Sequence, residues 1–405
     1  MSQRSISVEV LQPDYSARIS SISPGDVLSA SCTWQWWGVG TGTLVVRETG
    51  AAAAQLMRAR DLVVPVTMKA PGFPRWDGYV VHAQETKTAG KVGRITATLV
   101  DERKWMDRIL AAPVPGSPWS NQAAAEHDRR VGPLSTVVRQ YVAANVARMA
   151  AAGQPVPLVV AAPPGPDTSP VVTISARNET LADEVISTLK ANRYEIRAYL
   201  WLPGDPQPPG LALTTSSVVI DVVAGREKLY VNFSDDRGSI SERSVTVTPP
   251  GATSVIVGGP GEGTARVFES VIANDGRVES LGPWGRTEVF LDATDAETSA
   301  LRVSRGRDKL AELSGKVGVS LTINDQRPWK AGPNDDYWVG DRVRATFGSI
   351  RAEDHINRIT ITSNDKGFSV TPQFGDSSVS ESSDLALART VRELSAEIAS
   401  LRAKK

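Results

Sequence analysis

Short stretches of alternating apolar and polar residues dominate the first hundred positions of the chain. Ile95, Ala97 and Leu99, for example, fall on one face and the polar residues between them on the other, as a half-buried antiparallel strand requires. Clusters rich in glycine, proline and aspartate separate such stretches. The pattern predicts a β-sandwich or β-barrel over residues 1–104. Its strongest strands are expected at 42–47, 79–84 and 94–100.

The period changes to that of a helix in the next hundred residues. Apolar residues recur at i, i+3, i+4, i+7, i+8 and i+12 over 134–146, which predicts a helix of about four turns with one apolar stripe. Helices also fit 101–110 and 181–191, and a strand fits 194–202. Six prolines within 155–170 predict an extended linker or surface loop. This combination is typical of a small α/β insertion.

The β pattern resumes over the second half of the chain, interrupted by one polar helix predicted at 295–314. Glycine and proline turns separate the strands, and Asp-Lys-Gly at 365–367 predicts the turn of a hairpin near the end. The predicted strands are 218–223, 229–233, 244–248, 254–257, 265–271, 317–323, 341–347, 356–362 and 368–371.

The C-terminal segment differs again, because a Ser/Asp-rich linker at 376–384 leads into a helical pattern. The apolar residues of this pattern are spaced 4, 3, 4 and 3 positions apart, like the seam of a coiled coil, and their types favour two strands over three. The stripe predicts an oligomer interface, and the alternative is a helix that packs back on its own chain. Its members are Leu387, Val391, Leu394, Ile398 and Leu401.

The chain of 405 residues is long enough for two to four domains of ordinary size. Its 33 glycines and 26 prolines exceed the usual proportion, which favours a turn-rich β protein over a fibrous or disordered one. We predict an N-terminal β domain, a helical and α/β insertion with the proline-rich loop, a β domain, a second β domain with one helix, and a linker with the C-terminal helix. Their bounds are 1–104, 105–210, 211–285, 286–376 and 377–405.

The 45 Lys and Arg residues balance 45 Asp and Glu residues, so net charge provides no general attraction for nucleic acid or an anionic membrane. The single cysteine, Cys32, cannot form an intramolecular disulfide or a thiolate-rich metal site. His82, His127 and His355 are far apart in sequence. No signal peptide or membrane-spanning apolar run is evident. We therefore expect a protein made in the cytoplasm, with no metal, no cofactor and no membrane insertion.

A glycine-rich loop at 258–263, after an apolar strand, is the feature closest to a nucleotide-binding motif. Such a loop must open a helix whose N-terminal amides receive the pyrophosphate, whereas the residues that follow here alternate as a strand. Acidic pairs at 235–236, 292/295 and 335–336 fit solvated turns. The chain has no Gly-x-Ser-x-Gly or His-Glu-x-x-His motif. We predict no catalytic residue and no enzymatic activity.

Three of the ten tryptophans, Trp34, Trp36 and Trp37, lie together before a second glycine-rich loop at 38–42. Strand alternation would place Trp34 and Trp36 on one face and Trp37 on the other. Tryptophans pack in a core or a subunit interface, or stack on sugar rings when they are exposed. Both interpretations, interface and glycan contact, stay open at this point.

Several segments, taken in order, resemble the minor tail proteins of siphoviruses that infect actinobacteria, the family of the tail-tip or baseplate hub. Residues 134–142 resemble its helix ahead of a Tyr-Val pair, and 233–240 resemble its Phe-Ser turn. Residues 255–266, with Ile-Val-Gly-Gly-Pro-Gly-Glu-Gly-Thr-Ala-Arg at their core, resemble its Val-Gly-Gly-x-Gly-Glu-Gly segment. Residues 337–343, with the strands after them, resemble its closing barrel.

The resemblance implies a mainly β fold with tail-hub-like β-barrel domains, an α/β insertion and a C-terminal coiled-coil helix. In the hubs of long-tailed phages, two such domains from each of three chains form a ring around the path of tape-measure protein and DNA. The resemblance implies a non-enzymatic homotrimer at the virion tail tip that contacts the distal tail or tail-tube protein, the tape-measure protein and other minor tail proteins. DNA would pass through without specific binding. The alternative is a tail-tip protein that binds or cleaves glycans of the host cell envelope.

Overall fold

The chain divides into two compact units. Unit 1 consists of Met1–Ser239 and Ile323–Thr371, and unit 2 consists of Ile240–Thr322 and Pro372–Lys405. The predicted C-terminal stripe, Leu387 to Leu401, lies outside the described residues. The five-segment division stays a prediction. The computed structural model describes residues 5–49, 51–234, 236, 240–274, 285–314, 316–323, 329–347 and 350–374.

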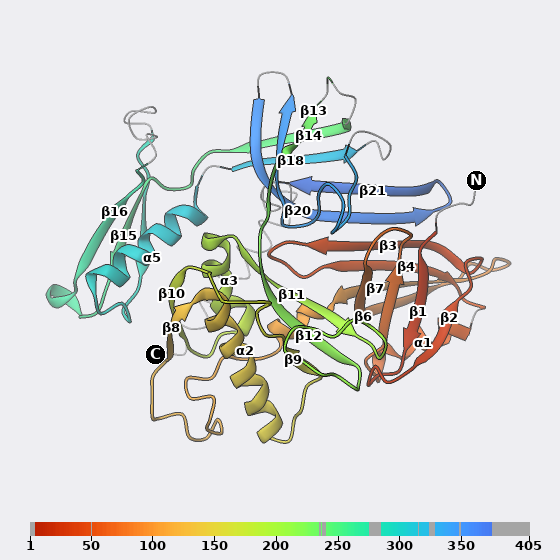
Figure 1. Ribbon diagram of the computed structural model, residues 1–405, viewed down its shortest axis with the longest axis horizontal. Helices are drawn as coiled ribbons and strands as arrows, with labels where there is room; N and C mark the ends of the chain where they lie inside the picture. Colours follow the sequence, from red (N-terminus) through yellow and green to blue (C-terminus); the bar gives the residue numbers. More distant parts are fainter. Residues whose placement is uncertain are drawn as a thin grey trace. The chain divides into compact units, whose positions relative to one another are not determined.

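A long sheet of antiparallel pairs forms the frame of unit 1 (Figure 1). Strands β4, β6 and β7 confirm the three strongest alternating stretches, and the fold is mainly β as expected. Among the described strands the path does not close into the expected barrel, because it ends at β2, which pairs with β1 alone. In spatial order the strands are β20 (Ile350–Asn364), β3 (Val27–Gln35), β4 (Thr41–Arg47), β7 (Arg94–Asp101), β6 (Arg75–Thr86), β5 (Pro65–Lys69), β1 (Ser7–Leu11) and β2 (Arg18–Ile22).

The register of these strands explains why alternation predicted them. In the β4–β7 pair, Leu44 lies opposite Ala97 and Val46 lies opposite Ile95, so the apolar residues of both strands face the same side. All four side chains are buried. Burial of a large aliphatic side chain contributes about 1.5–3 kcal/mol, which is enough to fix the register, since a one-residue slip would expose the whole set.

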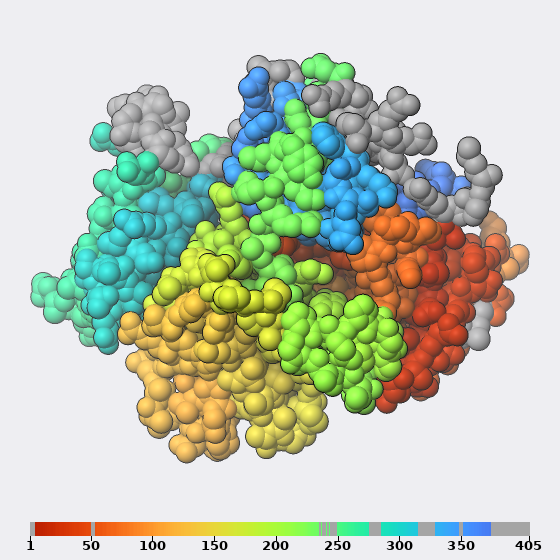
Figure 2. Space-filling view, in the orientation of Figure 1, coloured from red at the N-terminus to blue at the C-terminus, as the bar shows by residue number. Residues whose placement is uncertain are grey.

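Segments from opposite ends of unit 1 meet where β3 pairs with β20. Ile359 lies opposite Trp34, and Ile361 lies opposite Cys32. β19 pairs antiparallel with β20 and parallel with β13, and β21 follows β20 across the turn predicted at 365–367, which confirms the hairpin. In Figure 2 the blue surface of the late strands lies against the red and orange surface of the first strands. The further strands are β13 (Glu227–Ser234), β19 (Arg342–Phe347) and β21 (Gly367–Phe374).

Unit 1 also contains an α/β layer built on helices α2 and α3, both of which the periodicity predicted. The two helices share one apolar core with the three-stranded sheet β11–β12–β9. β9 lies inside the proline-rich segment and pairs parallel with β12, so that segment is partly a strand. No helix within the described ranges is long and apolar enough to cross a membrane. The elements are β8 (Asp128–Pro133), α2 (Leu134–Ala151), β9 (Leu158–Val160), β10 (Val171–Ala176), α3 (Leu181–Asn192), β11 (Tyr194–Trp201) and β12 (Ser217–Ala224).

Two local predictions in unit 1 were wrong. The segment 101–110 forms only a short 3-10 helix, η2 (Glu102–Asp107), because Glu102 and Arg103 are drawn into buried contacts with other elements. Helix α1 (Ala51–Met57) and the 3-10 turn η1 (Arg58–Arg60) interrupt the region predicted as β alone. A run of four alanines begins α1, and alanine has the highest helix propensity.

In unit 2 a three-stranded sheet carries a helix on one face (Figure 1). β15 lies in the centre, antiparallel to β16 and parallel to β17, and α5 packs on its inner face. α5 confirms the polar helix, and Thr298 caps it by accepting from the N–H of Leu301. The strand predicted at 265–271 begins only at Phe268, because η3 precedes it. The elements are β14 (Ile240–Thr248), β15 (Ser254–Gly258), η3 (Gly263–Ala265), β16 (Phe268–Ile272), β17 (Glu288–Asp292), α5 (Ser299–Glu312) and β18 (Lys316–Ile323).

Candidate interaction site

The three neighbouring tryptophans lie at the end of β3, in unit 1. β3 ends at Gln35, so the expected alternation stops before Trp36 and Trp37, which lie in the following turn. Trp37 has a positive φ of 58°, and its ring lies 5.9 Å from that of Trp36. The turn therefore gathers Trp36 and Trp37 instead of sending them to opposite faces.

Trp36 is packed between β20 and the segment that precedes β19. Its side chain is only 5% exposed and stacks on His355, with ring centroids 6.4 Å apart and an interplanar angle of 11°. On its other side lies Gly340, whose φ is +87°. A Cβ at Gly340 would lie 2.4 Å from Cζ3 of Trp36, so both the backbone conformation and the contact require glycine.

Trp37 joins the β3–β4 turn to β11. Its indole N–H donates to the carbonyl of Tyr194 at 2.7 Å, and its backbone N–H donates to the carboxylate of Glu195. Its ring meets His355 edge-on at 5.4 Å. The polar atoms of this tryptophan are thus used inside the chain.

Trp34 and Trp36 both line a cleft, and Trp34 is the more exposed of the two. Its half-buried ring meets Trp338 edge-on at 5.2 Å, and Trp338 in turn lies 6.1 Å from Phe73. The cleft has a volume of about 990 Å³. Its walls come from β6, from β11 with the loop at 205–209 that follows it, and from the segment around Gly340.

Polar side chains in this cleft are largely paired with one another. Arg75 donates to Asp77 at 2.7 Å and, across the cleft, to Asp205 at 3.0 Å. Asp205 also accepts from the N–H of Leu202 at 3.0 Å. These bonds link β6 to the loop after β11 and occupy the groups that a ligand would otherwise bind.

Beside the cleft, charged groups are buried where η2 meets β11. The guanidinium of Arg103 lies 2.7 Å from the carboxylate of Glu195, and both side chains are almost fully buried. Arg103 also donates to the carbonyl of Gly38, and Asp101 accepts from the N–H of Gly40 at 2.7 Å. Burial raises the pKa of both Asp101 and Glu195 to about 7, and Arg103 opposes the shift.

Glu102 is buried among aromatic groups of the same layer. Its carboxylate accepts from the hydroxyl of Tyr15 at 3.0 Å and from the indole N–H of Trp105 at 3.1 Å. Burial, together with the nearby charge of Asp77, raises the pKa of Glu102 to about 8. A carboxyl in this setting is mostly protonated at neutral pH.

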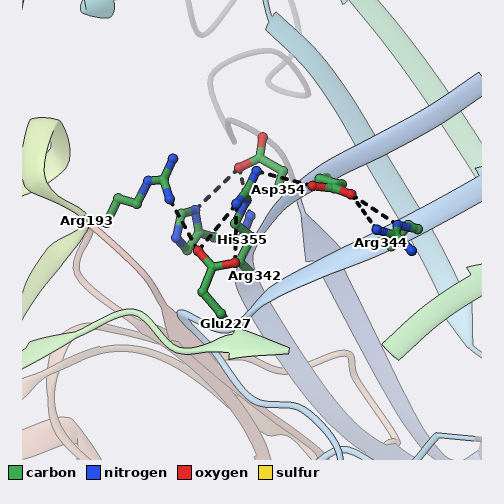
Figure 3. Close-up of polar contacts among 7 residues, drawn as sticks. Arg193, Glu227, Arg342, Arg344, Asp354 and His355 are labelled. Atoms are coloured by element: carbon green, nitrogen blue, oxygen red, sulfur yellow. Dashed lines mark hydrogen bonds and ion pairs between the residues drawn. The ribbon is translucent and has the colours of Figure 1, made fainter. Parts of the chain in front are cut away.

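A half-exposed ionic network connects α3 to β13, β19 and β20 (Figure 3). Glu227 accepts from Arg193 at 3.2 Å and from Arg342 at 3.2 Å, and Arg344 binds Glu353 at 2.7 Å. His355, whose ring stacks on Trp36, donates its backbone N–H to the carboxylate of Asp354 at 2.7 Å on this side of the sheet. Exposed pairs of this kind fix orientation more than they add stability.

A second ion pair holds the segment around Gly340 in place. Arg226, at the β12–β13 turn, binds Asp341 through two nitrogens at 2.6 and 2.8 Å. Asp341 is almost fully buried and also accepts from the N–H of Trp338 at 2.8 Å. The pair therefore positions both Trp338 and Gly340 against the tryptophans of β3.

The arrangement is suited to joining segments of the chain. Among the described residues, no group of three or more His, Cys, Asp or Glu side chains is placed to hold a metal ion. Of the acidic residues singled out in the sequence, Asp292 pairs with Arg266, Asp295 with Arg305, and Asp335 with Lys330. The loop at 258–263 leads through η3 into β16, an antiparallel partner of β15, as its sequence predicted.

Several residues of this region had no distinctive sequence signal. Arg103 and Glu195 belong to charged stretches that look solvent-exposed, and only the fold brings them together. His355 appeared as one of three scattered histidines, yet it is the ring against which Trp36 and Trp37 pack. The stripe from Leu387 to Leu401 lies outside the described part of the chain.

The fold is that of phage tail proteins. The chain is similar to the tail protein from Neisseria meningitidis MC58, with a TM-score of 0.50 and 11% identity, covering 92% of this chain and 97% of that one. It is also similar to the 43 kDa tail protein of prophage MuSo2 from Shewanella oneidensis, with a TM-score of 0.52 and 11% identity, covering 91% and 98%. No curated protein matches the sequence.

The sequence itself identifies the family. The model of the Siphovirus ReqiPepy6 Gp37-like protein family matches residues 7–376, and the chain belongs to that family. The resemblance to siphovirus tail proteins noted from four short segments is thereby confirmed over most of the chain.

We predict that Gly340→Ala destabilises unit 1 more than Gly367→Ala does. Both glycines have positive φ, which costs a side-chain-bearing residue about 1–2 kcal/mol, but only Gly340 would also press a Cβ into Trp36. Overpacking adds about 1–3 kcal/mol. Thermal unfolding followed by tryptophan fluorescence measures the difference. Equal losses for the two variants would contradict the packing described for Trp36.

We predict that the protein loses stability as pH rises from about 5 to about 8.5. The pKa values of Asp101, Glu102 and Glu195 are raised on folding, so the native chain binds more protons than the unfolded chain in this window. Unfolding midpoints across the window test this. Glu102→Gln should flatten the dependence, whereas Glu9→Gln on β1 should leave it unchanged. A midpoint that rises with pH would refute the raised pKa values of these three carboxyls.

Proposed function

We propose that this chain is a structural hub protein of the tail tip, which joins the tail tube to the tip complex and surrounds the genome-ejection channel. The observation that carries the proposal is membership of a siphovirus tail protein family over residues 7–376. The shared fold with two tail proteins, over more than nine tenths of each chain, supports it. We expect the chain to act through interfaces rather than through a catalytic site.

The proposed hub is a homotrimer whose β strands build a ring. The β2 edge supports this, because among the described strands β2 pairs with β1 alone and keeps one edge for another strand. Its partners would be the distal tail or tail-tube protein, the tape-measure protein and other minor tail proteins. DNA would pass through the ring without specific binding, in keeping with the balanced charge of the chain.

We propose that Trp34, Trp36 and Trp37 serve the packing of unit 1 rather than glycan binding. A sugar platform needs an exposed aromatic face, but Trp36 is buried and both N–H groups of Trp37 are bonded inside the chain. Trp34 and Trp36 border the cleft, but Trp36 is only 5% exposed, and charged groups of the cleft such as Arg75 and Asp205 are already paired. The glycan-binding or glycan-cleaving alternative therefore has less support from the geometry than the hub.

We predict that a tag inserted on this protein marks the tail tip of purified virions. The β6–β7 turn near Gly90 is exposed, has a positive φ and meets nothing that a side chain would clash with, so it tolerates an insertion. Negative-stain electron microscopy with a gold-labelled tag gives the position. Labels along the tail shaft or on the capsid would refute the hub proposal.

We predict that the purified chain is a trimer by native mass spectrometry and stays trimeric after truncation at residue 376. The ring surfaces would then hold the oligomer without the C-terminal stripe. Loss of the trimer on truncation would assign the oligomer contact to Leu387–Leu401 instead. A monomer at all concentrations for the full-length chain would count against the homotrimer.

A further inference from the structure

The sheet of unit 2 has one covered face and one open face. Val255, Val257 and Val271 point toward α5 and form a small buried core with residues of that helix. The alternate residues point the other way, and among them Phe268, Phe290 and Ile272 are 56%, 53% and 63% exposed. Large apolar side chains gathered on one face of a soluble unit mark a docking surface.

These three side chains and Ile256 form one continuous surface, which we call the open face. The register places Ile256 opposite Phe290 on one side and Ser270 on the other. One row further along, Gly258 lies between Phe268 and Asp292, and Ile272 lies at the opposite end beside Ser254. The apolar groups thus lie on all three strands, with Ile256 and Phe290 in the central row and Ile272 and Phe268 at the two ends of β16.

Arg266 packs against the two aromatic rings at one end of the open face. Its guanidinium lies 5.3 Å from the ring centre of Phe290 and 5.8 Å from that of Phe268, and it pairs with Asp292. A Cβ at Gly258 would lie 2.7 Å from Phe290 and 2.8 Å from Arg266. Because glycine has no side chain, both groups can pack against the backbone of β15. The guanidinium and the two rings therefore pack against one another on this face.

The open face is too small to hold a free partner by itself. Three strands of five residues span about 17 Å by 10–15 Å, or on the order of 200 Å². A stable interface between separate proteins buries about 800 Å² on each partner. An occupant attached to the same chain needs far less area, because tethering raises its effective concentration to the millimolar range.

We propose that the C-terminal segment of the same chain covers the open face with its apolar stripe, Leu387, Val391, Leu394, Ile398 and Leu401. The stripe spans fourteen residue steps in the sequence, or about 21 Å as a helix, which matches the length of the strands. With α5 on the other face, the sheet then becomes the middle layer of a three-layer unit.

The connection is long enough for this docking. Phe374, the last described residue, pairs with Val319 on β18, and Val319 follows the end of α5 at Glu312 by seven residues. The start of the tail therefore lies within about 30 Å of the end of the helix that covers the sheet. The thirteen residue steps from Phe374 to Leu387 reach about 40 Å when extended.

Disulfide trapping in the full-length chain tests the proposal. In the helix that the sequence predicts, Thr390 would flank the stripe and Ala396 would lie on the opposite side, so each is combined with Ser270→Cys in the centre of the open face. The native thiol does not interfere, because Cys32 is fully buried and burial raises its pKa to about 12. Oxidation is followed by non-reducing gel and intact mass.

The Ser270→Cys/Thr390→Cys pair should form a bond within one chain about tenfold faster than the matched Ser270→Cys/Ala396→Cys pair. Adding Leu394→Glu should abolish this preference. Equal rates for the two pairs would mean that the tail does not dock on the open face. Disulfide-linked dimers from the Thr390→Cys variant would mean that a second copy is the occupant, and would overturn the proposal. Either result leaves the hub proposal intact, since it concerns unit 1 and the family.

Discussion

The pairing of β3 with β20 is the interaction on which unit 1 depends. It joins the first strands of the chain to the last ones, with Thr33 and Thr360 bonded through their hydroxyls at 3.0 Å. The same pair brings His355 under Trp36 and sets the distance to Gly340, where no side chain can be accommodated. Each of these contacts exists only if the register is correct, because a shift of one residue would invert every side chain of β20.

Two ion pairs fix the positions of the segments that surround this strand pair. Arg103 and Glu195 place η2 against β11, and Arg226 with Asp341 places the Gly340 segment against β13. Both partners of the Arg103–Glu195 pair are buried, whereas in the other pair Asp341 is buried and Arg226 is half-exposed. Buried ionic groups contribute little net stability compared with apolar contacts, but a wrong arrangement would leave a buried charge unpaired at high cost. The buried charges therefore select one arrangement of segments, which suits a protein that must present fixed surfaces to its neighbours.

The local elements were predictable from the sequence, but their assembly was not. Alternation identified β4 and β7, and the apolar stripe identified α2. Both patterns are visible in the sequence because they depend only on which face of a single strand or helix is buried. η2 was mistaken for an α-helix, since nothing in its sequence reveals that Glu102 meets Tyr15 from another element. The open path of the sheet likewise depends on β2 having β1 as its single partner among the described strands, which no local pattern reveals. Family membership was detectable because short glycine and aromatic motifs keep their order along the chain.

The same pairing determines how the protein must be made. Thr33 and Thr360 are 327 positions apart, and a ribosome adds about 5–20 residues per second, so β3 waits on the order of half a minute for its partner. During that time β4 can pair with one edge of β3, while the other edge and Trp34 remain available to any strand nearby. When many copies are synthesised in an infected cell, wrong pairing between nascent chains therefore competes with the pairing of β3 and β20. A sheet whose central strands pair so late would benefit from a chaperone that shields the β3 edge.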